Sequence, residues 1–199
     1  MRNATLFQLP IKKFKLVCFI LLVAASILQP RVLPAVTVQD ISDGKYLDSV
    51  LHLIQKARES IYISMYIINP KESDKHPVGQ LMEALLEARK RKVKITIWMN
   101  SAFDPENAVD REKFAAFWEK IKSKGIKVHM ATRSKRLHDK LVVVDGEWVV
   151  DGSTNWTLAA LKKNSESDSL IHSKELAQEK IKRLNELLLE PDEPKEKAT

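Results

Sequence analysis

The sequence predicts an α/β fold in which helices are layered on a mostly buried sheet. Two observations support this prediction. From about residue 36 onward, segments with helical periodicity alternate with short apolar segments rich in β-branched and aromatic residues. The chain of 199 residues is also long enough for one domain with a substantial core, and short for two. Because strands that alternate with helices usually form a sheet covered by helices, we expect one α/β domain.

The expected elements follow one another along the chain. Strands are expected at residues 60–68, 93–99, 126–130, 140–145, 147–152 and 167–171. Helices are expected within residues 43–60, 78–92, 104–125, 156–162 and 173–190. One face of the first helix carries Leu47, Val50, Leu51, Ile54 and Ala57. Asp145-Gly146 is a turn pair between two apolar strands, which predicts a hairpin.

The first 35 residues differ from the rest of the chain. They contain five basic residues and no acidic one, and residues 16–28 form an apolar run of 13 residues. This run is short for a membrane span, which needs about 20 residues, and is typical of a signal peptide. The cleavage signal is poor, because Leu33 lies where a small residue is preferred before Ala35. An uncleaved membrane anchor at residues 16–28 is therefore the alternative, and a buried core helix is the least favoured reading.

The chain therefore divides into a leader or anchor (residues 1–35), a domain (36–190) and a charged tail (191–199) that we expect to be disordered. With either reading of the leader, the domain is exported across the cytoplasmic membrane, to become periplasmic, secreted or membrane-anchored. Without the leader, the net charge falls from +7 to +2, so overall charge does not indicate a nucleic-acid partner. The single cysteine, Cys18, excludes an intrachain disulfide and a cysteine-based zinc site.

Polar residues interrupt the two apolar strands of the expected hairpin. The pattern reads His138-x-Lys140-x4-Asp145-x6-Gly152-Ser153-x-Asn155. Residues i and i+2 of a strand share a face, so His138 and Lys140 project together. An imidazole can attack phosphorus or transfer a proton while an ammonium neutralises phosphate oxygens. Residues 152–155 lie where a strand gives way to a helix, a position where main-chain N–H groups can hold an anion.

Each of these residues also has an ordinary structural explanation. A single histidine is most often a surface residue, Asp-Gly is usually a turn, and Ser-Thr-Asn usually caps a helix. The combination is far less ordinary. Six fixed residues at fixed spacing arise by chance on the order of once in 10⁵ to 10⁶ chains of this length.

The pattern resembles the HKD motif of the phospholipase D superfamily at every defining position from His138 to Asn155. Residues 60–100 resemble the family's first strand, helix and second strand, and "NSESDSLI" resembles its N-x-E segment, which would place Glu166 near the motif. The resemblance implies a phospholipase D-like α-β-α domain with a mixed, largely buried sheet. Since the chain contains one motif, it is most similar to the single-motif nucleases of the Nuc and Zucchini type, which pair two chains to build one site.

This resemblance implies a role for each residue of the pattern. His138 of one subunit would form a phosphohistidine, and His138 of the partner subunit would serve as acid and then base. Lys140, Ser153 and Asn155 would hold phosphate oxygens. Glu166 would hydrogen-bond the imidazole and fix its tautomer. Asp145 and Gly152 would support the motif.

The leading hypothesis is a metal-independent endonuclease that hydrolyses DNA or RNA at a homodimer interface, without a cofactor. The first alternative is phospholipase D-type hydrolysis of phospholipid headgroups, which a membrane anchor would favour. The second alternative is a non-catalytic tether for nucleic acid or membrane, against which the complete motif argues. The expected partners are thus a second copy of the chain and nucleic acid, with phospholipid as the alternative substrate and the membrane as the partner of an uncleaved N-terminal segment.

Overall fold

The computed structural model describes residues 36–100, 108–131 and 137–187. By their internal contacts, residues form two units, Met1–Pro34 and Ala35–Thr199, and every described residue belongs to the second. The expected leader at residues 1–35 and the expected tail at 191–199 lie outside the described residues. Within those described ranges, no helix is both long enough and apolar enough to cross a membrane.

The described residues of the second unit form a seven-stranded sheet and helices that cover it. The strands are β1 (Thr37–Asp40), β2 (Ser60–Met65), β3 (Lys94–Asn100), β4 (Lys127–Ala131), β5 (Lys140–Val144), β6 (Trp148–Gly152) and β7 (Asp168–His172). The helices are α2 (Lys45–Lys56), α3 (Pro77–Lys90), α4 (Ala108–Ser123), α5 (Leu158–Lys162) and α6 (Lys174–Glu186). Each element predicted from the sequence is present, but β1 was not predicted. All four of its residues are exposed, and no apolar alternation marks it as a strand.

The sheet is mixed, with the strand order β1-β7-β6-β5-β2-β3-β4. Strands β2, β3 and β4 run parallel to one another. The other neighbours, from β1 through β7, β6 and β5 to β2, pair antiparallel. Strand β2 therefore belongs to both parts, and its pairing with β5 is the seam between them.

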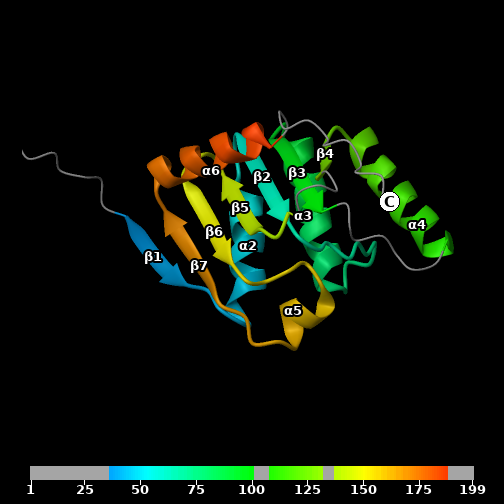
Figure 1. Cartoon of the computed structure of the whole chain (residues 1–199), viewed down its shortest axis with the longest axis horizontal. Helices are drawn as coiled ribbons and strands as arrows, with labels where there is room; N and C mark the ends of the chain where they lie inside the picture. The colour runs from blue at the N-terminus through cyan, green and yellow to red at the C-terminus, as the bar shows by residue number, and fades with distance from the viewer. Residues whose placement is uncertain (1–35, 101–107, 132–136, 188–199) are drawn as a thin grey trace, which may run out of the picture. The chain divides into compact units, whose positions relative to one another are not determined.

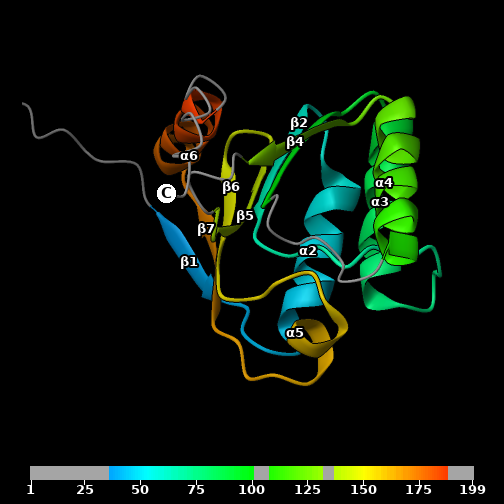
Figure 2. The same cartoon turned by 45° about the vertical axis from the view of Figure 1, so that its right-hand side comes forward.

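Helices cover both faces of this sheet (Figures 1 and 2). On one face, α2, α3 and α4 pack on a large core that includes Ile61, Val142 and Val150. On the other face, Leu141, Val143 and Val149 pack in a smaller cluster with Ala177 and Leu184 of α6. Alternate residues of β5 and β6 thus enter opposite cores, as the pleat of a strand requires. The predicted layered α/β fold with a mixed, largely buried sheet is confirmed.

Candidate active site

Lys140, the first residue of β5, and His138, two residues before it, form the centre of the site. Lys140 pairs with Met65 at the end of β2, and its side chain is buried, with the residue 7% exposed, whereas His138 is exposed. The Lys140 Nζ lies 3.3 Å from Nδ1 and 3.4 Å from Nε2 of His138, and donates to the His138 carbonyl oxygen at 3.0 Å. The predicted proximity of the imidazole and the ammonium is thus present in the structure.

Tyr66, which follows β2, contacts both groups. Its ring centroid lies 4.5 Å from that of His138, and the Lys140 Nζ lies 5.0 Å from the Tyr66 ring centroid. This contact limits the positions that the imidazole and the ammonium can take. Sequence reasoning did not single out Tyr66, because an aromatic residue in an apolar strand is ordinary.

Burial lowers the pKa of Lys140, and the negative charges of Glu166 and Asp139 oppose that effect by raising it. The two carboxylates therefore favour the charged form of Lys140, which desolvation disfavours. A partly desolvated ammonium is also a strong electrostatic partner for an incoming phosphate oxygen.

Gly152 to Asn155 lead out of β6 toward Ile67, the residue that follows Tyr66. A Cβ on Gly152 would lie 2.2 Å from the Asp168 Oδ1, so only glycine fits without a displacement of β7. The Asn155 Oδ1 accepts a hydrogen bond from the main-chain N–H of Ile67 at 3.2 Å. Because the oxygen faces Ile67, the amide NH₂ of Asn155 is turned to the other side as a donor.

Asp168 holds the centre of this loop and was missed by sequence reasoning. Its buried carboxylate, with the residue 2% exposed, accepts from the Thr154 N–H at 3.1 Å and from the Thr154 Oγ1 at 2.5 Å. Burial raises the pKa of Asp168, and the hydrogen bonds from Thr154 oppose this effect. The sequence does not distinguish Asp168 from the other acidic residues near it, because its partner, Thr154, follows a different strand.

Glu166 and Ser153 bind each other at the rim of the site. The Ser153 Oγ donates to the Glu166 Oε2 at 2.5 Å, and the Asn164 amide donates to Oε1 at 2.9 Å. The expected hydrogen bond between Glu166 and His138 is not among the contacts of the described residues. Ser153 is the partner of Glu166 instead of His138. The strands β6 and β7 are antiparallel neighbours, so residue 153 lies opposite the residues that precede β7.

Asp145 lies at the opposite end of β5 from Lys140. Its carboxylate accepts three main-chain hydrogen bonds, from Arg58 at 2.9 Å, Glu59 at 2.8 Å and Ser60 at 3.0 Å. These bonds attach the hairpin to the start of β2 and keep β2 and β5 in register. Asp145 itself has a φ of 52°, which an aspartate tolerates better than most residues.

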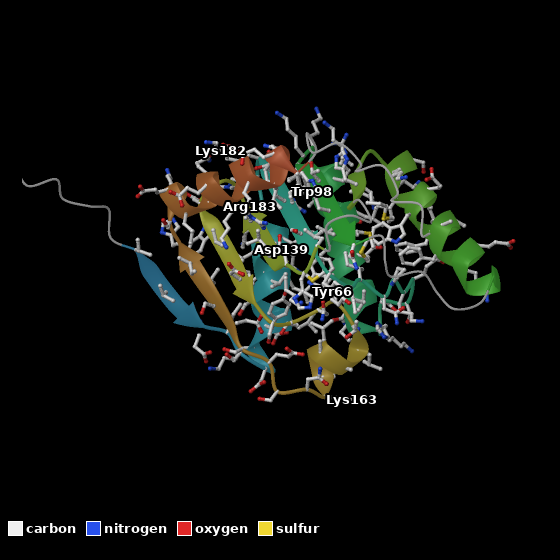
Figure 3. All side chains as sticks on the ribbon, in the orientation of Figure 1. Tyr66, Trp98, Asp139, Lys163, Lys182 and Arg183 are labelled. Atoms are coloured by element: carbon white, nitrogen blue, oxygen red, sulfur yellow. The ribbon has the colours of Figure 1, made fainter. Side chains whose placement is uncertain are left out.

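Asp139, the residue between His138 and Lys140, faces the other side of the sheet. Its carboxylate accepts from the Ser64 Oγ at 2.8 Å and forms an ion pair with Arg183 of α6. Figure 3 shows Asp139 between Arg183 and Tyr66. Among the described residues, no group of three or more His, Cys, Asp or Glu side chains could hold a metal ion.

Comparisons with known proteins relate the chain to one family. The family model described as "Cardiolipin synthase, PLD-like domain" matches residues 50–188. Proteins named phospholipase D from Rickettsia typhi and Rickettsia prowazekii are each 31% identical over 129 residues, which cover 65% of the chain. The match covers 56% of each relative, so the chain spans about half the length of these curated relatives.

Solved structures share the fold. Nuc from Salmonella typhimurium, a phospholipase D family member, gives a TM-score of 0.63 at 28% identity, and the match covers 79% of the chain and 95% of Nuc. NucT from Helicobacter pylori gives a TM-score of 0.59 at 15% identity, with 78% of the chain and 97% of NucT covered. At 15% identity the likeness concerns the fold alone.

Proposed function

The chain belongs to the phospholipase D superfamily, and from this membership we propose that it is a metal-independent phosphodiesterase that cleaves nucleic acid. The observation that carries the proposal is the exposed imidazole of His138 beside the buried ammonium of Lys140, with the Asn155 loop next to them. An exposed nucleophile and a desolvated cation suit an anionic diester that approaches from solvent.

The proposed reaction has two steps and needs two imidazoles. A nitrogen of His138 attacks phosphorus, and the bond from phosphorus to the leaving oxygen breaks as the partner subunit's His138 donates a proton to that oxygen. The partner imidazole then takes a proton from water, whose oxygen attacks the phosphohistidine and restores His138. Lys140 and Asn155 bind the phosphate oxygens in both steps. A two-fold homodimer supplies both imidazoles from one chain, which is why we include it in the proposal.

Two observations bear on the substrate. Nuclease activity is favoured by the similarity to Nuc, which extends over 95% of that chain. Phospholipid hydrolysis is the second candidate, because the curated relatives carry the name phospholipase D. Export of the domain, or its anchoring through residues 16–28, is also part of the proposal, and an anchor would bring the site near lipid.

The full chain, purified in EDTA, tests the proposal against DNA, RNA and phosphatidylcholine vesicles in parallel. We expect cleavage of nucleic acid, and a loss of at least about 10³-fold in His138→Ala. His52→Ala, which removes another exposed histidine on α2, is the matched control and should keep the wild-type rate. Cleavage of phosphatidylcholine alone would favour the second candidate. An absolute requirement for added divalent metal, or binding without cleavage of any substrate, would refute the proposed mechanism.

Subunit mixing tests the homodimer. When wild-type and His138→Ala chains exchange at equal amounts, about one quarter of the dimers contain two intact chains, so the activity per wild-type chain should halve. Activity that stays proportional to the wild-type chain at every ratio would contradict a shared site.

A further inference from the structure

The residue between the two reacting groups points away from the substrate side. Leu141 and Val143 of β5 pack under α6, whereas Val142 and Val144 enter the core on the other face. Lys140 lies on the opposite side from α6 by the same alternation, with His138 beside it, whereas Asp139 reaches Arg183 on the α6 side. The main chain here is also linked to the end of β2, because the Tyr66 N–H donates to the Asp139 carbonyl oxygen at 2.7 Å.

The Asp139 side chain joins β2 and α6 to the segment just before β5. Ser64 of β2 is completely buried, and its hydroxyl donates to the Asp139 Oδ2 at 2.8 Å. Arg183 of α6 forms an ion pair with the same oxygen, and the Asp139 side chain is 25% exposed. A carboxylate with two donors from two elements is held far more firmly than a solvated surface acid.

We infer that Asp139, held by Ser64 and Arg183, is a positioning residue that sets the direction in which His138 and Lys140 face the substrate. The inference rests on the proposed function, since it assigns the reaction to those two residues. Rotation of the main chain at residue 139 would turn both neighbours at once, because they project from the same short segment. Small misplacements of reacting groups reduce rates strongly even when the groups themselves are intact.

The charge of Asp139 also acts on Lys140. The His138 and Tyr66 rings contact the ammonium, and the charges of Glu166 and Asp139 also act on it, that of Asp139 from the α6 side of the sheet. Burial lowers the pKa of Lys140, and the Asp139 charge raises it. Removal of that charge must therefore lower the Lys140 pKa further, and the ammonium will lose its proton at lower pH.

A neighbouring ion pair on the same helix provides a matched control. Lys180, three residues before Arg183, donates to Asp151 of β6 at 2.5 Å. This pair also joins α6 to the sheet, but Asp151 pairs with Leu141 and Ser169 rather than with a residue of the site. Asp151→Asn and Asp139→Asn are thus equivalent changes that differ in their distance from the reacting groups.

The experiment compares these two variants with the wild-type full chain, with bis(4-nitrophenyl) phosphate and DNA as probes. We expect Asp139→Asn to lower kcat by about 10- to 100-fold with KM within about two-fold, and Asp151→Asn to keep the wild-type kcat. Arg183→Gln should lower kcat in the same direction, and Arg183→Lys should restore part of it. In chains labelled with ¹³C-lysine, the Lys140 titration midpoint should fall in Asp139→Asn and stay constant in Asp151→Asn.

An unchanged kcat and an unchanged Lys140 titration in Asp139→Asn would overturn the inference. Equal losses of kcat in Asp139→Asn and Asp151→Asn would also overturn it, because they would indicate a general loosening of α6. The titration of Lys140 can be measured whether or not the chain has catalytic activity. A wild-type chain that cleaves no diester would therefore refute the proposed function, while the titration would still decide whether Asp139 controls Lys140.

Discussion

Gly152→Ala perturbs the loop that carries Asn155 through a single added atom. The new Cβ would lie 2.2 Å from the Asp168 Oδ1, 2.5 Å from the Ser167 carbonyl oxygen and 2.7 Å from the Asp168 Cα. All three distances are below 3.0 Å, which real Cβ atoms essentially never show. Two of the three atoms are main chain, and β7 cannot move away freely because it pairs with both β1 and β6.

The size of the effect follows from this overlap. Overpacking of a well-packed site destabilises a protein by about 1–3 kcal/mol. For a chain of this size, each kcal/mol lowers Tm by about 2–4 °C, so we expect a fall of about 2–12 °C in thermal unfolding followed by circular dichroism. The displaced Asp168 also holds Thr154, so Asn155 should shift and kcat should fall at least about 10-fold.

Gly44→Ala is the matched control for this substitution. A Cβ at Gly44 meets nothing within 4 Å, and the residue has ordinary helical angles, with φ of −62° and ψ of −13°. Its Tm should therefore equal or exceed that of the wild type. If Gly152→Ala kept the Tm within about 1 °C and the wild-type rate, the reasoning about the close approach of β6 and β7 would be wrong.

Two further predictions concern carboxylates outside the reacting pair. Asp145→Ala removes the acceptor of three main-chain N–H groups at residues 58–60, so it should destabilise the protein by about 1–3 kcal/mol, measured as a lower urea midpoint, whereas Asp145→Asn should lose less. An unchanged midpoint in Asp145→Ala would contradict this role. At Asp40, the hydrogen bond from Lys45 at 2.8 Å is the main reason that its pKa is lowered to about 2. Because this pKa is lowered in the folded state, its contribution to stability is present above pH 4 and is lost as pH falls toward 2. Lys45→Ala should move the Asp40 pKa back toward 3.8 in an NMR titration, and a pKa that stayed near 2 would show that Lys45 is not the cause.

Much of the fold could be predicted because most elements carry strong local patterns. The valine-rich strands β5 and β6 around the Asp145-Gly146 turn are found where expected, with φ of 52° and 64° at the turn residues. The predicted boundaries of the elements were less accurate than their type and order. Residues 60–68 were expected to form one strand, but β2 ends at Met65, because Tyr66 pairs with Asp139 and Ile68 bridges to Trp156. On α2, the buried face includes Leu53, whereas Leu51 is half-buried.

The site shows a similar division between local and distant information. Spacing along one strand was enough to predict that His138 and Lys140 come together. This spacing was not enough to predict the residues that hold the site in place. Arg183 lies 44 residues from Asp139 in sequence, and Ser64 lies 75 residues away, so their contacts depend on the packing of α6 and on the sheet order. For the same reason, the expected partner of Glu166 was His138, whereas Glu166 accepts hydrogen bonds from Ser153 and Asn164.

The seam between β2 and β5 has a consequence for the order in which the protein folds. Strands β5 and β6 form a local hairpin, and β7 follows after a short helix, whereas the pairing of β5 with β2 closes a loop of about 75 residues. Long loops close late in folding, because closing them costs conformational entropy before the contacts that compensate for this cost have formed. We therefore expect the reacting groups to come together only in a late folding step. Partial unfolding at the seam between β2 and β5 would abolish activity while most secondary structure persists. Under denaturing conditions, activity would therefore be lost before the chain is fully unfolded.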